Sequence, residues 1–257
     1  MHQVTELNRP GIAVTAADQL ATDETMLLIA DRANSEDAHG KDERVDVDTE
    51  FIRVWQFDSP TVILGRSSRI ADEVDQDFCR ASGIPVLRRC SGGASVVGGP
   101  GCLMYSVVLS FDEKPELQKI DAAHKHVMAH ILRSVMAQLP DAAMQGICDL
   151  TWNNRKCSGN SLRVARRHLL YHGTILHDFD LELLARCLTH APRQPEYRDG
   201  RDHDEFVTNI PIDPNRFESD LMTQFQVTKT INAAAWIDQI DQLRRDRYDS
   251  AAWHVRH

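Results

Sequence analysis

Short segments rich in β-branched and aromatic residues alternate irregularly with segments of helical periodicity, and this order limits the folds open to the chain. The predicted strands are 51–57, 61–64, 84–87, 102–111 and 169–176. The predicted helices are 16–33, 70–82, 117–139 and 231–243. A strict βαβ repeat would indicate a doubly wound sheet. This order instead favours an α/β fold of the α+β type, with a mixed β-sheet flanked by helices.

The length of 257 residues, 42% of them hydrophobic, suffices for one substantial core, and we expect a single domain over 1–257. Three polar segments are expected to lie outside that core. The acidic segment 35–50 is expected to form a solvated loop. The segment 192–211 is expected to pack over a functional surface as a lid, and the basic tail 244–257 to fray.

Composition and charge exclude several classes of protein. A net charge of -9 opposes binding to nucleic acid. The six cysteines include no CxxC pair, so we expect reduced thiols rather than a zinc ribbon or a disulfide scaffold. The longest apolar stretch, 103–111, is far shorter than the roughly 18 residues of a membrane-spanning helix. The first residues do not resemble a targeting peptide, so we expect a cytoplasmic protein without a membrane partner.

Two glycine clusters lie between two predicted strands in the segment 86–109. Arg88 and Arg89 precede the first cluster, Ser91-Gly92-Gly93, and the second follows at 98–101. Glycine lets backbone N–H groups approach a ligand, and arginine suits phosphate or carboxylate, so the segment predicts an anion site. A tight connection that needs flexible residues is an equally good interpretation. The usual nucleotide-binding motifs GxxxxGK[ST] and GxGxxG are absent.

A second informative stretch covers 148–180. Lys156 precedes the turn Ser158-Gly159, and a polar turn then leads into a strand that carries His172-Gly173. A lysine beside a glycine turn is by itself usually a surface residue. A functional interpretation therefore depends on both stretches together.

Together the two stretches resemble the lipoate-protein ligase family, which belongs to a wider group with octanoyltransferases and biotin-protein ligases. The family's RRxSGGxA loop corresponds to 88–94, its DL segment with KxSG to 149–150 and 156–161, and its HGTLL strand to 172–176. The order and spacing match, and the likeness covers most of the chain.

The resemblance implies an enzyme that joins lipoate to ATP, releases pyrophosphate and passes the acyl group to a lysine of a carrier domain. Lys156 is implied as the catalytic cation, at the α-phosphate and the acyl carbonyl oxygen, where charge accumulates. The residues implied to bind substrate and adenylate are Arg89, Ser91, Gly92, Gly93, Ala94, Asp149, Ser158, Gly159, His172 and Gly173. Magnesium is expected to accompany ATP, with no metal site built from protein residues.

The implied partners are lipoyl domains, either of the E2 subunits of 2-oxoacid dehydrogenases or the H protein of glycine cleavage. Larger members of the family carry a C-terminal domain for which no segment remains here, so a separate accessory subunit is expected as a further partner. Arg163, Arg166 and Arg167 form a basic turn against the acidic average. This turn is either a solvated hairpin tip or a docking surface for an acidic carrier.

Two alternatives remain. An octanoyl or lipoyl transferase would act without ATP through a cysteine thioester, and the GPG run at 99–101 is similar to that of octanoyltransferases. Neither Cys148 nor Cys187 matches the expected register of the nucleophile, and Cys90 and Cys157 are interpreted as packing residues. The other alternative is a non-catalytic module that binds an adenylate or a carrier.

Three histidines on a predicted helix are candidate metal ligands. His126 and His130 stand four residues apart, and His124 lies just before them. No HExxH glutamate accompanies them, so we interpret all three as solvent-facing helix residues.

Overall fold

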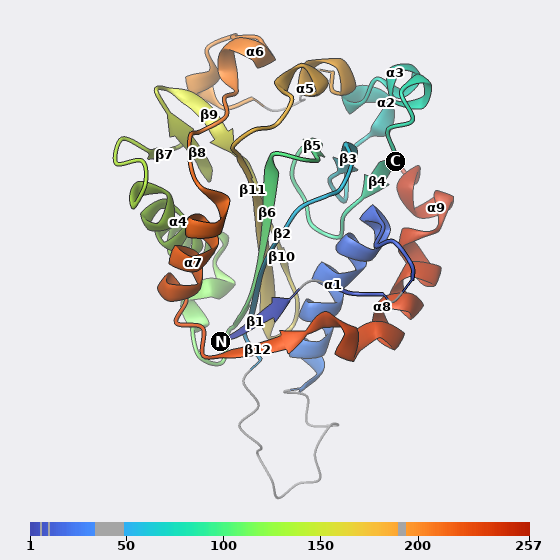
Figure 1. Cartoon of the computed structure of the whole chain (residues 1–257), viewed down its shortest axis with the longest axis vertical. Helices are drawn as coiled ribbons and strands as arrows, with labels where there is room; N and C mark the ends of the chain where they lie inside the picture. Colours follow the sequence, from blue (N-terminus) through green and yellow to red (C-terminus); the bar gives the residue numbers. More distant parts are fainter. Residues whose placement is uncertain (6, 10, 34–48, 190–193) are drawn as a thin grey trace, which may run out of the picture.

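A six-stranded mixed sheet forms the centre of the molecule in the computed structural model, with strand order β10-β11-β6-β2-β1-β12 (Figure 1). The structure describes residues 1–257 except 6, 10, 34–48 and 190–193. The strands of this sheet are β1 (His2–Thr5), β2 (Phe51–Trp55), β6 (Cys102–Ser110), β10 (Asn160–Val164), β11 (His168–Leu176) and β12 (Lys229–Asn232).

Two three-stranded sheets stand beside the central one. The first, in the order β4-β3-β5, contains β3 (Thr61–Leu64), β4 (Val86–Arg88) and β5 (Val96–Gly98). The second, in the order β7-β8-β9, contains β7 (Ala143–Gln145), β8 (Asp149–Trp152) and β9 (Arg155–Ser158). The predicted architecture, a mixed sheet flanked by helices, is thereby confirmed.

Helices cover both faces of the central sheet (Figure 1). On one face lie α1 (Ala16–Ala33) and α8 (Ile237–Leu243), and on the other α4 (Ile120–Met136) and α7 (Pro214–Gln224). The short helices are α2 (Ile70–Glu73), α3 (Gln76–Ala81), α5 (Leu181–Cys187), α6 (His203–Phe206) and α9 (Ala251–His254), with single-turn or irregular helices η2 (Pro115–Gln118), η3 (Glu196–Arg198), η4 (Ala233–Trp236) and η5 (Arg244–Tyr248).

The strands β6 and β11 are buried along their full length because apolar clusters pack on both faces of the sheet. They pair antiparallel over nine residues from His168–Ser110 to Leu176–Cys102, and Ser106 lies opposite His172. Leu27 and Leu170 belong to the cluster under α1, whereas Val127 and Tyr171 belong to the cluster under α4. This pair of strands is the rigid base on which the candidate site is built.

Several predicted elements are confirmed and others change their bounds. The helix at 16–33 and the strand at 61–64 form as predicted. The predicted helix 70–82 divides at Val74, which bridges Leu188, and Asp75 caps the second part by accepting a hydrogen bond from the backbone N–H of Phe78. The predicted helix 231–243 begins as β12 because this segment pairs in parallel with β1.

The segments expected to lie outside the core differ from that prediction where the structure describes them. Residues 35–48 of the acidic segment lie outside the described residues, whereas Glu50 is buried and its Oε1 lies 2.7 Å from Lys114 Nζ. The prediction that the tail 244–257 frays is wrong, because 244–248 and 251–254 form helical turns and Tyr248 is fully buried. No helix among the described residues is long and apolar enough to span a membrane.

The histidines of α4 are more buried than predicted. His124 is buried and its Nδ1 lies 2.9 Å from the hydroxyl of Tyr171. The rings of His126 and His130 meet at 5.0 Å, and no cluster of three metal-ligating side chains occurs among the residues that the structure describes. Burial lowers the pKa of His130 to about 4, and positive neighbours act in the same direction.

Acidification is expected to destabilise the fold through His130. Its pKa in the folded state lies below the value of about 6.5 in unfolded chains, so folding favours the neutral ring. The resulting stability is complete above pH 6.5 and is lost as the pH falls toward 4. Urea unfolding at pH 7 and pH 5 should show a larger drop for the wild type than for His130→Gln. An equal drop in both proteins would contradict this assignment.

Candidate active site

The glycine loop, residues 89–95, connects β4 with β5 and lies against the end of β3. The backbone N–H of Arg66 donates to the carbonyl of Ser91 at 2.7 Å, which brings the two chain segments together. A Cβ atom at Gly65 would overlap the carbonyl oxygen of Gly93, so only glycine fits there. Gly93 itself has a φ of 83°, in the left-handed region that favours glycine.

The Arg89 side chain points into the loop and is nearly fully buried. Its guanidinium donates to the carbonyls of Gly92 at 2.5 Å, Ala94 at 2.9 Å and Ile63 at 3.1 Å. Its Nε donates to the hydroxyl of Ser91 at 3.1 Å. Burial lowers the pKa of Arg89 to about 10, which leaves it charged at neutral pH. Arg89 therefore stabilises the conformation of the glycine loop from the inside.

His172 on β11 joins the glycine loop to helix α1. Its Nε2 shares a short hydrogen bond with the hydroxyl of Ser91, and its Nδ1 lies 3.4 Å from Asp23 Oδ2. The hydroxyl of Ser106 donates to the same carboxylate oxygen at 2.7 Å. His172 is buried, so these hydrogen bonds fix the orientation of its ring and of the Ser91 side chain.

Lys156 on β9 is paired with Asp149 on β8, at 2.7 Å between Nζ and Oδ1. The lysine side chain keeps 27% of its surface exposed, so the ammonium group remains accessible. The other oxygen of Asp149 accepts a hydrogen bond from the hydroxyl of Tyr197 at 2.8 Å. Burial raises the pKa of Tyr197 above its ordinary value, and the neighbouring Asp149 acts in the same direction.

The turn between β9 and β10 brings the lysine strand to the glycine loop. The hydroxyl of Ser161 donates to the carbonyl of Gly92 at 2.8 Å. Gly159 pairs with Thr174 through its backbone, and Ser158 accepts a hydrogen bond from Asn160 Nδ2 at 3.1 Å. A Cβ atom at Gly173 would overlap Asn160 Oδ1, which explains the glycine. The two stretches that the sequence singles out are therefore in contact.

The segment expected to form a lid packs beside this site where it is described. Tyr197 reaches Asp149, and the N–H of Thr208 donates to the carbonyl of Lys156 at 2.9 Å. Residues 192 and 193 of the predicted segment lie outside the described residues.

The basic turn divides into residues with different surroundings. Arg163 forms an ion pair with the buried Glu24, so its charge faces the interior. Arg166 is exposed, and Arg167 Nη1 lies 3.6 Å from Asp112 Oδ2. His168, which directly follows Arg167, is fully buried and shares a hydrogen bond of 2.8 Å with Thr49.

All six cysteines are free thiols, and five of them are buried. Burial raises the pKa of Cys148 to about 11 and that of Cys90, Cys157 and Cys187 to about 12. Cys148, the partly exposed one, has Asp149 next to it, which also raises its pKa. None of these four thiols is activated toward the thiolate that a thioester mechanism needs.

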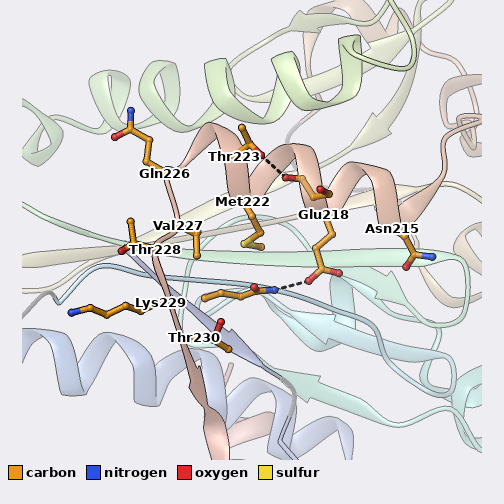
Figure 2. A pocket seen from close by; sticks show the side chains of 11 residues that line it. Asn215, Glu218, Met222, Thr223, Gln226, Val227, Thr228, Lys229 and Thr230 are labelled. Carbon is orange, nitrogen blue, oxygen red and sulfur yellow. Dashed lines mark hydrogen bonds between the residues drawn. The ribbon is translucent and has the colours of Figure 1, made fainter.

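A cleft of about 800 Å³ between α7 and the strands β1 and β12 is separate from this site (Figure 2). Its wall is mixed, since Met222 and Val227 line it beside polar side chains, and Gln3 Nε2 donates to Glu218 Oε1 at 2.9 Å. None of the residues predicted to bind substrate or adenylate lines this cleft. The cleft is therefore not part of the candidate active site.

Sequence reasoning missed several contributors to the site. Asp23 and Glu24 stood out only as members of a helix, and Tyr197 only as part of a polar segment. A signal for Asp23 was available, because a carboxylate on the apolar stripe of a helix must find a buried partner. Tyr197 gave no comparable signal.

Comparison with known proteins agrees with the fold and with the motifs. The family model of the lipoyl protein ligase A/B catalytic domain matches residues 16–226. Lipoate-protein ligase 1 of Staphylococcus aureus is 24% identical over 214 residues, which cover 78% of this chain and 63% of that protein. The chain therefore spans less than two thirds of this curated relative.

Solved structures share the same fold. The bi-partite lipoate protein ligase of Thermoplasma acidophilum, studied with its E2 lipoyl domain, has a TM-score of 0.76 at 20% identity and covers 99% of this chain and 95% of its own. A lipoate-protein ligase A bound with ATP has a TM-score of 0.74 at 19% identity, with coverages of 99% and 98%. The protein belongs to the lipoyl protein ligase A/B catalytic domain family.

Proposed function

We propose that this protein is a lipoate-protein ligase that activates lipoate with ATP and transfers the lipoyl group to a lysine of a lipoyl domain. The observation that carries the proposal is the contact between the glycine loop and the Lys156 turn through Ser161 and Gly92. This contact joins an accessible ammonium group to a loop suited to anions, as a negatively charged intermediate requires.

In the first step, a carboxylate oxygen of lipoate attacks the α-phosphorus of ATP, and the bond to pyrophosphate breaks. Lys156 exchanges its partner Asp149 for the phosphate and carbonyl oxygens of the resulting lipoyl-adenylate. In the second step, the carrier's lysine amine attacks the acyl carbon, the bond from that carbon to the phosphate oxygen breaks as AMP leaves, and the proton released by the amine passes to water. Binding is assigned to Ser91, Gly92, Gly93, Ala94, Ser158, Gly159 and Gly173, with Asp149 and His172 orienting the charged groups. Arg89, predicted as a further binding residue, is assigned to holding the glycine loop instead, because its guanidinium donates to the carbonyls of Gly92 and Ala94.

Magnesium enters with ATP in this proposal. Mg²⁺ in phosphate-binding sites usually keeps several waters and contacts the substrate's phosphates with few protein carboxylates.

The deciding experiment is acylation of a purified E2 lipoyl domain by lipoate, followed by mass spectrometry with and without ATP. The proposal predicts a lipoyl mass increase with ATP and none without it. Acylation from an acyl-carrier protein in the absence of ATP would establish the transferase alternative. A glycine cleavage H protein tested in parallel, with and without added accessory subunit, would define the carrier.

Cysteine substitution distinguishes the two chemistries in a second way. Cys148→Ser and Cys187→Ser should retain the wild-type rate of lipoyl transfer, because neither thiol takes part in an adenylate mechanism. The measurement is the initial rate of carrier acylation, with Cys79→Ser as a matched control for a buried thiol. Loss of activity confined to Cys148→Ser, with unchanged unfolding, would contradict the adenylate mechanism.

Carrier docking is assigned to the exposed part of the basic turn. The double charge reversal Arg166→Glu and Arg167→Glu should slow acyl transfer several-fold at low salt and spare pyrophosphate release, because electrostatic steering acts on the encounter with the carrier. At high salt, the acyl-transfer rates of the wild type and the double variant should become equal. Equal slowing of both steps at all salt concentrations would refute this role. Arg163 stays outside the double variant because it holds Glu24.

A further inference from the structure

The segment 248–256 contacts both backbone stretches that shape the glycine loop, although it lies more than 150 residues away in sequence. The indole N–H of Trp253 donates to the carbonyl of Arg88 at 2.8 Å. The backbone N–H of Arg88 donates to His254 Nδ1 at 2.9 Å. Arg256 donates to the carbonyl of Arg66 at 2.8 Å. In Figure 1, α9 lies beside β4, where the loop begins.

The buried side chain of Arg88 also connects the stretch after β3 with the segment 248–256. It is fully buried, and its Nη1 donates to the carbonyls of Gly65 and Ser68, each at 2.7 Å. Its Nη2 donates to the carbonyl of His254 at 2.8 Å. One guanidinium therefore ties the end of β3, the start of the loop and the segment 248–256 together.

The segment is itself held by helix α1. The hydroxyl of Tyr248 donates to Glu24 Oε2 at 2.7 Å, and Arg244, four residues before the segment, donates to Asp18 Oδ1 at 2.9 Å. The Trp253 ring lies near the guanidinium groups of Arg247 and Arg256, at 4.6 Å and 4.0 Å. These contacts give the segment a fixed position from which it can restrain the loop.

His254 acts in one protonation state. Its Nε2 lies 2.9 Å from the carbonyl of Tyr248 and therefore carries the proton, which leaves Nδ1 free to accept from Arg88. Burial lowers the pKa of His254, and the nearby Arg88 acts in the same direction while Asp249 opposes it. The ring is thus neutral at neutral pH, as the hydrogen bond to Arg88 requires.

We propose that Trp253 and His254 are positioning residues that hold the Arg88 backbone, and through it the glycine loop, in the conformation that receives the anionic adenylate. The identity of the ligand as an adenylate rests on the proposed function, whereas the restraint on the loop rests on the contacts described above. A loop held in its binding conformation loses less conformational freedom when the ligand arrives, so its N–H donors bind the anion more tightly.

The first test follows hydrogen–deuterium exchange of the peptide 86–92 in the protein without ligand. His254→Ala should speed its exchange by about 5- to 100-fold, because an internal hydrogen bond is lost. His254→Asn should restore protection, since Asn Oδ1 takes the place of Nδ1. Arg245→Ala, an exposed change three residues before the segment, is the matched control. Wild-type protection in His254→Ala would overturn the proposal.

The second test measures lipoate-dependent exchange of pyrophosphate into ATP. His254→Ala should raise the KM for ATP several-fold and change kcat less, and His254→Asn should recover the wild-type KM. If the loop exchanges faster while both constants stay unchanged, the positioning role is refuted. If His254→Ala fails to fold, Trp253→Phe, which removes only the donor to Arg88, replaces it in both tests. If the wild type itself is inactive, the proposed function fails and the first test still decides on the restraint.

Discussion

Replacing Lys156 with alanine is expected to reduce lipoate-dependent pyrophosphate exchange by at least about 100-fold, the loss seen when one preorganised charge-stabilising donor is removed. The Lys156 side chain is partly exposed with its Nζ 2.7 Å from Asp149, and Ser161, five residues further on, contacts the glycine loop at Gly92. The measurement is the exchange rate at saturating ATP and lipoate.

The fold should survive this change, because the Lys156 side chain is partly exposed and its loss leaves Asp149 hydrogen-bonded to Tyr197. Circular dichroism and the urea midpoint check this point. Lys125→Ala, at an exposed position of α4, is the matched control and should keep wild-type activity. Full activity in Lys156→Ala would refute the assignment of this lysine.

The largest loss of stability is expected from Glu24→Ala. This carboxylate is 1% exposed and pairs with Arg163 and Arg247, while its second oxygen accepts from Tyr248. Burial by itself would raise the pKa of Glu24, but the two arginines outweigh it and the pKa lies below its ordinary value. Removing one partner of a buried charge cluster costs about 3–5 kcal/mol, and we expect the lower end because both arginines can reach water.

Equilibrium unfolding in urea measures this loss directly. Glu116→Ala, at an exposed position, is the matched control and should change the free energy of unfolding by less than about 0.5 kcal/mol. If Glu24→Ala were as stable as this control, the contacts of Glu24 with Arg163, Arg247 and Tyr248 would not stabilise the fold, which would contradict this prediction.

The sequence predicted the helices and strands whose apolar periodicity is long and local. Helix α1 and strand β6 are of this kind, because α1 packs on the cluster at one face of the sheet and β6 contributes to the clusters at both faces. The hairpin of β8 and β9 was missed because its strands are short and polar. A turn signal was present, since Asn153 and Asn154 have φ values of 50° and 58°, as a two-residue hairpin loop requires.

Non-local charge pairs explain most of what could not be predicted. The tail 244–257 looked like a solvated basic end, yet Arg244 and Arg247 meet carboxylates of α1 more than 200 residues earlier. The sequence places Arg89 beside a glycine cluster, but only the structure shows that its guanidinium faces the loop carbonyls. A sequence pattern locates such a residue and does not give the direction of its side chain.

The central claim is that Lys156 neutralises the adenylate at the glycine loop, and a crystal structure with bound lipoyl-adenylate tests it most directly. We expect Lys156 Nζ within about 3 Å of a phosphate or acyl oxygen, with the phosphate against the backbone of 91–93. A ligand bound elsewhere, with Lys156 still paired to Asp149, would contradict it.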